Sequence, residues 1–108
     1  MTWTVTTKYT RPNTGVAWYN ESGPEAGPMT DSDVAYIQSN YVDNGKRVSA
    51  DVTVSGEDLV QCKTFVFRDK AAYDEYEADS KITTFMSAQQ SYNSSNNITL
   101  TSRTSSAT

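Results

Sequence analysis

The chain of 108 residues contains no histidine and one cysteine. Without histidine, the commonest general base and metal ligand is missing, and so are Ser-His and Cys-His nucleophilic pairs. A single cysteine, Cys62, excludes an intramolecular disulfide and an ordinary zinc site. Because Cys62 lies in an apolar segment, we expect a buried, inert thiol. We therefore expect no metal and no cofactor.

Long apolar runs and basic clusters are also missing. No run approaches the roughly 20 apolar residues that a membrane-spanning helix needs, so we expect no membrane partner. The nine Lys and Arg residues are scattered and the net charge is −4, which argues against nucleic acid as a partner. The first residues, Met1–Thr4, resemble a strand and not a signal peptide, which favours a cytoplasmic location (host cytoplasm or virion for a viral protein).

Hydroxyl side chains and tyrosines are abundant instead. The chain has 13 Ser and 15 Thr, 36% hydrophobic residues, and seven Tyr beside three Phe. Such a polar chain has room for one small domain, and small polar domains often gain apolar burial by pairing with a second copy. Tyrosine rings suit boundaries between apolar and wet surroundings. We interpret most of these rings as core or interface residues and fewer as the rim of a ligand pocket.

Hydrophobic patterning predicts four strands and two helices. Strict alternation marks strands at residues 3–11, 47–54 and 59–67, and a shorter one at 98–101. The strand at 59–67 carries apolar groups on both faces, so we place it centrally. Thr30 and Asp69 are suited to cap the two helices, with Asp33 completing a capping box after Thr30. Asp79-Ser80 is a candidate interruption of the second helix.

This order, βαββαβ, predicts an α+β, ferredoxin-like fold. Right-handed crossovers place both helices on one face of a four-stranded antiparallel sheet. We expect one domain over residues 1–101, followed by a flexible polar tail at 102–108. The helix-free face of the sheet is expected to meet solvent or the same face of a second copy, which would give a dimeric α+β barrel.

Candidate binding residues lie in the segment 16–29, which either covers a pocket or forms a plain surface loop. Within it, Trp18, Tyr19 and Asn20 are the residues we would place near a small aromatic ligand. No residue combination predicts a catalytic or metal site. Acidic residues gather on the second helix, and a solvated helix face explains them better than a cation site or a patch for a basic partner: Asp69, Asp74, Glu75, Glu77 and Asp79.

The segment Val60–Phe67 followed by Arg68–Tyr76 resembles the dimeric α+β barrel families, which include antibiotic-biosynthesis monooxygenases. The resemblance spans roughly residues 47–101 and includes the turn after Tyr92-Asn93 into the last strand. It implies a homodimer but carries no motif for activity. More loosely, Trp3-Thr4-Val5-Thr6-Thr7 and Tyr9-Thr10-Arg11-Pro12 resemble small proteins of marine tailed phages (cyanophages).

Two functional hypotheses follow. The favoured one is a non-enzymatic, self-associating protein of viral origin that acts in an assembly with itself or another protein. The alternative is a dimeric α+β barrel that binds or oxidises a small aromatic ligand without a cofactor. The absent catalytic groups favour the first, and the surplus of aromatic rings leaves room for the second.

Overall fold

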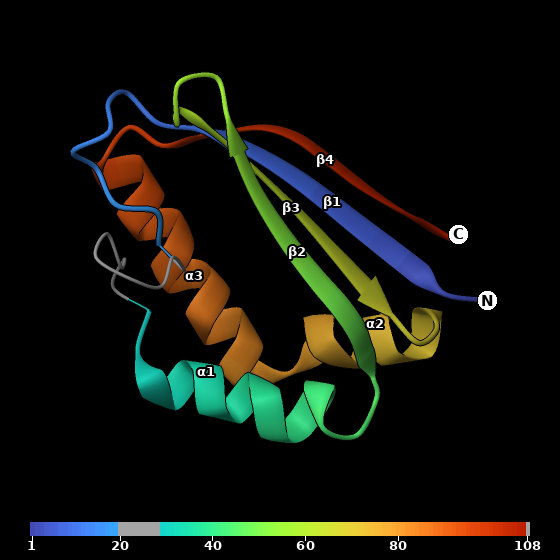
Figure 1. Cartoon of the computed structure of the whole chain (residues 1–108). Coiled ribbons are helices and arrows are strands. Elements are labelled where there is room, and N and C mark those ends of the chain that lie inside the picture. The colour runs from blue at the N-terminus through green and yellow to red at the C-terminus, as the bar shows by residue number, and fades with distance from the viewer. Residues whose placement is uncertain (20–28, 108) are drawn as a thin grey trace.

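The computed structural model describes residues 1–19 and 29–107. It is an α+β structure in which three helices lie on one side of a four-stranded sheet (Figure 1). In chain order the elements are β1 (Trp3–Thr10), α1 (Asp31–Ile37), a π-helical continuation η1 (Gln38–Val42), β2 (Arg47–Ser55), β3 (Val60–Phe67), α2 (Lys70–Ala78), α3 (Ser80–Ser95) and β4 (Thr99–Ala107).

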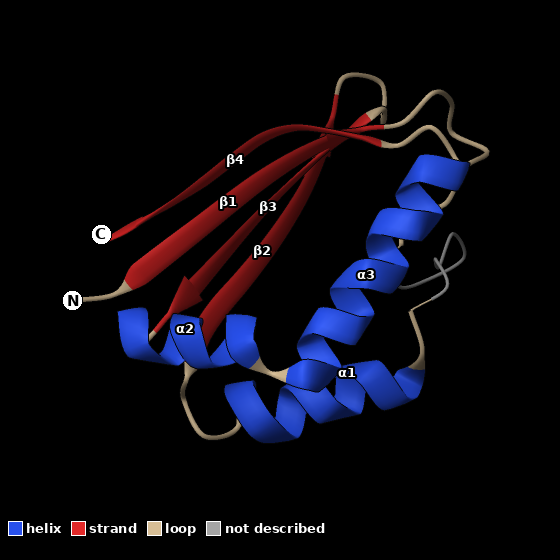
Figure 2. Cartoon of the chain, turned by 180° about the vertical axis from the view of Figure 1, so that it is seen from behind, coloured by secondary structure: helices blue, strands red, loops and turns tan. Residues whose placement is uncertain are grey.

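The sheet is antiparallel throughout, with the strand order β2-β3-β1-β4. Each βαβ crossover therefore skips one strand: β1 and β2 flank β3, and β3 and β4 flank β1. This arrangement is compatible with a ferredoxin-like fold, and it confirms the predicted central position of β3. The helices leave the opposite face of the sheet bare (Figure 2).

Alternation decides which side chains meet the helices. Val5 and Phe67 point toward the helices and are buried, as period-two patterning predicts. Their neighbours along β1, β3 and β4 point to the helix-free face, where hydroxyl groups predominate: Thr4, Thr6, Thr10, Thr64, Ser102, Thr104 and Ser106. A face so rich in threonine can meet water, so the bare side does not by itself require a second copy.

Two sequence-based expectations are corrected here. Residues 102–107, expected to form a flexible tail, continue β4 and pair with β1 from Trp3 to Lys8. The error arose because a Ser/Thr-rich edge strand has no hydrophobic alternation to reveal it. Cys62, expected to be buried, is partly exposed, because its side chain points to the helix-free face.

The first helix begins as predicted. The Thr30 hydroxyl accepts from the Asp33 amide, and the Asp33 carboxylate accepts from the Thr30 amide, which together form a capping box. After Ile37 the helix widens into η1, and Gly45, with φ of +76°, allows the chain to turn into β2. Of the segment 16–29, residues 20–28 lie outside the described residues.

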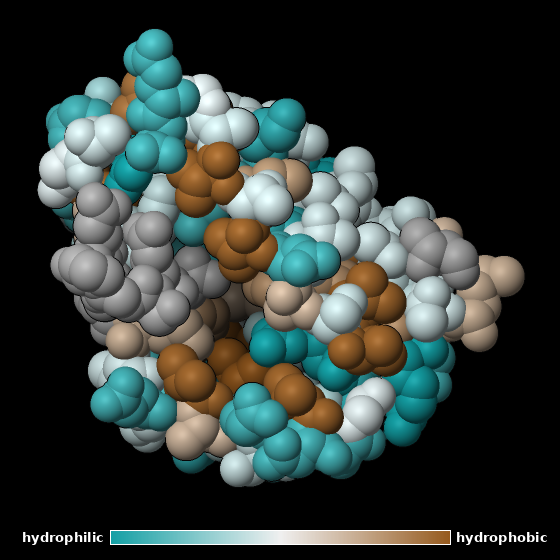
Figure 3. Space-filling model, viewed as in Figure 1, coloured by the Kyte–Doolittle hydropathy of each residue, from teal (hydrophilic) through white to brown (hydrophobic). Residues whose placement is uncertain are grey.

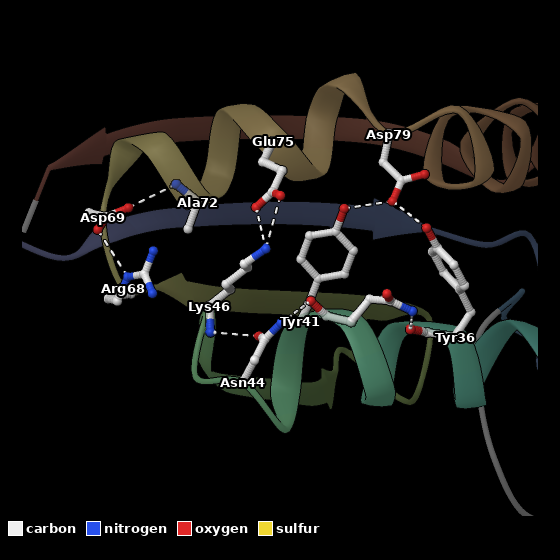
Figure 4. A network of polar contacts seen from close by, with 10 residues as sticks. Tyr36, Tyr41, Asn44, Lys46, Arg68, Asp69, Ala72, Glu75 and Asp79 are labelled. Carbon is white, nitrogen blue, oxygen red and sulfur yellow. Dashed lines mark hydrogen bonds and ion pairs between the residues drawn. The ribbon is translucent and has the colours of Figure 1, made fainter.

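The predicted interruption at Asp79 is present and organises the helical layer. Asp79 caps α3 by accepting from the Lys81 amide at 2.9 Å. The same carboxylate accepts from the hydroxyls of Tyr36 at 2.7 Å and Tyr41 at 2.6 Å (Figure 4). The hydrogen bond from Tyr41, with that from Tyr36 and the backbone bonds, lowers the pKa of Asp79. One carboxylate thus ties α1 and η1 to the junction of α2 and α3.

Packing around this junction forms the core. The Tyr41 and Tyr76 rings meet edge to face with centroids 5.0 Å apart, and Tyr76 lies 5.1 Å from the ring of Phe67. Ile37 and Ile82 complete a cluster that also includes Val5. The dense core therefore lies beneath the end of the sheet where β3 finishes.

Replacing Asp79 with alanine removes a helix cap and two tyrosine hydrogen bonds at once. We expect Asp79→Ala to lower the free energy of unfolding by about 2 kcal/mol, measured by urea denaturation. Asp69→Ala is the matched control, because Asp69 caps α2 through the Ala72 amide without holding a tyrosine. Equal losses in both variants would contradict the linking role of Asp79.

Candidate functional site

A cavity of about 500 Å³ lies between the sheet and the helices. Its walls come from β1 and β3 on the sheet side and from α2 and α3 on the other, with contributions from β2 and β4. Figure 3 shows the molecule hollowed between the sheet side and the α1 side, with hydrophobic residues around the hollow. Six aromatic rings line the cavity: Tyr9, Phe65, Phe67, Tyr73, Tyr76 and Phe85.

A lysine side chain is buried against this cavity. Lys63 lies at the middle of the central strand β3, on the helix-facing side between Gln61 and Phe65, and is only 4% exposed. Its Nζ lies 5.0 Å from the centroid of the Tyr9 ring, a distance at which a cation is attracted to the ring face. Among the described residues, no carboxylate lies within ion-pairing distance of Lys63.

Two arginines line the same cavity from opposite edges of the sheet. Arg47, at the start of β2, places its guanidinium 5.1 Å from the Phe65 ring centroid and has no carboxylate partner in the described part of the chain. Arg103 on β4 donates to Glu77 at 2.8 Å and to the Tyr73 hydroxyl at 2.7 Å. Among the described lining residues Glu77 is the one carboxylate. The cavity therefore carries excess positive charge inside an acidic protein.

Burial sets the protonation of these groups. Desolvation lowers the pKa of Lys63 from 10.5 to about 8 and also lowers that of Arg47. Desolvation likewise raises the pKa of Tyr9 and of Tyr76, so both hydroxyls remain protonated and able to donate hydrogen bonds. Near neutral pH the cavity thus offers a partly deprotonated amine, a guanidinium and hydroxyl donors.

Of the binding residues predicted from the sequence, Trp18 and Tyr19 do not line this cavity. Trp18 is 1% exposed and packs beneath the guanidinium of Arg11, at 4.7 Å. Tyr19 meets the rings of Phe85 and Tyr92 edge to face and lines a smaller cavity of about 410 Å³ against α1 and α3. Asn20 lies outside the described residues. Of the segment 16–29, Met29 lines the larger cavity.

Sequence reasoning missed Lys63, although a signal was present. In a strand judged to be central, the face that carries Leu59, Phe65 and Phe67 also carries a lysine. A charged residue at a core-facing position of a central strand is rare unless it is paired. No sequence pattern indicated that Arg47 and Arg103 line the same cavity as Lys63, because it is the order of the strands in the sheet that brings them there.

Comparison with protein-family models, curated proteins and solved structures gives no match. Within residues 1–19 and 29–107, no three His, Cys, Asp or Glu residues are grouped so that they could hold a metal ion. No helix in that part of the chain is both long and apolar enough to cross a membrane.

Burial of Lys63 has a consequence for stability. Because its pKa is lower in the folded chain than in the unfolded chain, the folded state binds fewer protons between about pH 8 and 10.5. Stability from this group therefore rises with pH in that window and is lowest below it. We expect Lys63→Met to raise the free energy of unfolding by about 1–3 kcal/mol at neutral pH, with the gain shrinking toward pH 10.

Urea denaturation across this pH range measures the effect. Lys8→Met is the matched control, because Lys8 lies on the same sheet but points to the helix-free face and is exposed. A stability gain in Lys63→Met that does not change with pH would contradict a buried cation as its cause.

Proposed function

We propose that the chain is a binding protein for a small, largely apolar molecule that carries an anionic group. The single observation that supports this proposal best is the buried ammonium of Lys63, which faces a cavity of about 500 Å³ without a carboxylate partner in the described chain. This proposal corresponds to the binding half of the alternative hypothesis.

The charge argument comes from desolvation. A buried cation is costly unless an anion or hydrogen-bond acceptor accompanies it. Arg103 meets this requirement through Glu77. Lys63 and Arg47 contact aromatic rings, and neither has a carboxylate partner among the described residues. A carboxylate, sulfonate or phosphate in the cavity would supply the missing partner.

The walls favour an apolar body for the ligand. Ligand pockets of roughly 300–1,000 Å³ are usually lined by hydrophobic and aromatic side chains with a few polar groups. Hydrophobic and aromatic side chains form the larger part of the lining here too, beside charged groups of the sheet and polar residues of α3. Phe65, Phe67 and Phe85 offer ring faces and edges, and Met86 adds a flexible apolar side chain. An aromatic acid or a medium-length aliphatic acid suits these surroundings.

The polar groups of the cavity suit binding better than oxidation. Glu77 is held by Arg103, and burial raises the pKa of Tyr9, Tyr73 and Tyr76, which weakens them as acids. These groups can orient a ligand through hydrogen bonds.

A matched pair of ligands tests the proposal. We expect 2-naphthoate to raise the melting temperature more than 2-naphthalenemethanol, the neutral compound of similar shape. A ligand at about 100 times its dissociation constant stabilises the folded state by roughly 2.7 kcal/mol. Lys63→Met should remove the preference for the acid, whereas Lys8→Met should keep it. Equal shifts by the two ligands in the wild-type chain would overturn the anionic part of the proposal.

A second proposal, self-association, is supported by the edge of β4. This strand is nine residues long, contains no proline, and has one charged residue, Arg103, which points toward the helices. Long edge strands without protective charges are templates for pairing with another chain. The other edge, β2, carries Asp51 and a register irregularity near Arg47. A second copy that pairs along β4 would extend the sheet.

Lysine substitutions on one edge strand at a time test whether a second copy pairs along β4 or along β2. We expect a dimer of the wild-type chain at high protein concentration by light scattering, and a monomer when Ser102 and Thr104 on β4 are both replaced by lysine. In the control variant, Ser49 and Thr53 of β2 are replaced by lysine. These residues lie on the helix-free face of the sheet, as Ser102 and Thr104 do, and we expect this variant to remain dimeric. A wild-type chain that stays monomeric at high concentration would contradict this proposal.

A further inference from the structure

The environment of Lys63 suits covalent chemistry as well as charge pairing. A lysine amine attacks carbonyl carbon only when it is neutral, and burial in apolar surroundings is one of the ways by which proteins produce a neutral amine. Lys63 is 4% exposed, its Nζ lies over the Tyr9 ring, and no described carboxylate is near enough to hold the proton. The four remaining lysines differ from it, because each is partly or fully exposed.

We propose that Lys63 captures an aldehyde or ketone with an apolar body as an imine inside the cavity. This inference rests on the proposed binding function and names a reactive class among its ligands. The Nζ lone pair attacks the carbonyl carbon and forms a carbon–nitrogen bond, while the carbonyl oxygen takes up a proton. The resulting carbinolamine loses one water and leaves the imine. No oxidant or reductant takes part.

The surroundings of Lys63 support each stage of this reaction. With the pKa lowered to about 8, roughly a tenth of the amine is neutral at pH 7 and about half at pH 8, far more than for an amine of ordinary pKa. A protonated imine is again a cation, and the Tyr9 ring, 5.0 Å from Nζ, can stabilise it as it stabilises the ammonium. The cavity volume of about 500 Å³ admits a bicyclic aromatic aldehyde.

Arg47 suggests how a carbonyl compound would be oriented. Its Cα pairs with Phe67 across the sheet, whereas Lys63 is four residues earlier on β3, a separation of roughly 13 Å along the strands. The Arg47 side chain turns toward Phe65, between these two positions. An anionic group on the ligand could therefore meet Arg47 while a carbonyl at its other end reaches Lys63.

Reductive trapping tests the inference on the full chain. The protein is incubated near pH 7.5 with 2-naphthaldehyde and sodium cyanoborohydride, which reduces an imine to a stable secondary amine. We expect an adduct on Lys63, heavier than the chain by the mass of the aldehyde less one oxygen, which peptide mapping distinguishes from labelling of the exposed Met1 amine. Labelling of Lys63 should be about tenfold or more faster than that of the exposed Lys8, with a rate that levels off above about pH 8.

Two controls keep the result interpretable. Lys63→Arg retains the positive charge without a nucleophilic amine and should lose the adduct, with circular dichroism reporting whether it folds. Excess 2-naphthoate should slow labelling of Lys63 in the wild-type chain, which needs no variant at all. Adducts spread evenly over the exposed lysines would overturn the inference, and so would labelling of Lys63 that naphthoate leaves unchanged although naphthoate binds to the protein.

Binding of 2-naphthoate to the same preparation separates the two proposals. If naphthoate binds and Lys63 stays unlabelled, the imine is overturned and the binding function stands. If naphthoate fails to bind and Lys63 is labelled rapidly, the covalent chemistry stands and the anionic ligand class is overturned. If neither occurs, both proposals are overturned.

Discussion

The carboxylate of Asp79 determines how the helices lie against the sheet. By capping α3 and accepting hydrogen bonds from Tyr36 and Tyr41, it divides what could have been one long helix into α2 and α3 and holds the first helix at their junction. α2 then packs through Tyr76 against Phe67, whereas α3 leaves the junction at an angle (Figure 1). Space remains between α3 and the sheet, and the larger cavity occupies it.

Lys63 explains why that space is not filled by closer packing. A leucine or methionine side chain at this position could be enclosed by ordinary apolar contacts, since cores tolerate such residues well. An ammonium cannot be enclosed in this way without an anion, so the wall of the cavity must remain open enough for water or a ligand to reach it.

Local patterns were sufficient for much of the fold. Alternation predicted β1, β2 and β3, the capping box at Thr30 predicted the start of α1, and Asp79 was identified as a break in the second helix. β4 was underestimated, because its pairing with β1 depends on a partner almost a hundred residues away and not on its own Ser/Thr-rich composition. For the site, patterning placed Lys63 on the correct strand and face, but nothing local showed that it lacks a carboxylate partner or that Arg47 and Arg103 line the same cavity.

The free-energy cost of burying the Lys63 ammonium supports the proposal that the cavity binds a ligand. A chain with a modest apolar core has little stability to spare. A buried cation with no carboxylate partner in the described part of the chain lowers the free energy of unfolding further, whereas methionine or glutamine, of similar size, would not carry this desolvation cost. Proteins retain such costly groups where activity or binding needs them. The helix-free face shows the contrast, since Lys8 stands there in solvent at little cost. The position of one lysine inside the layered structure, and not the total charge of the chain, is therefore what supports the proposed binding function.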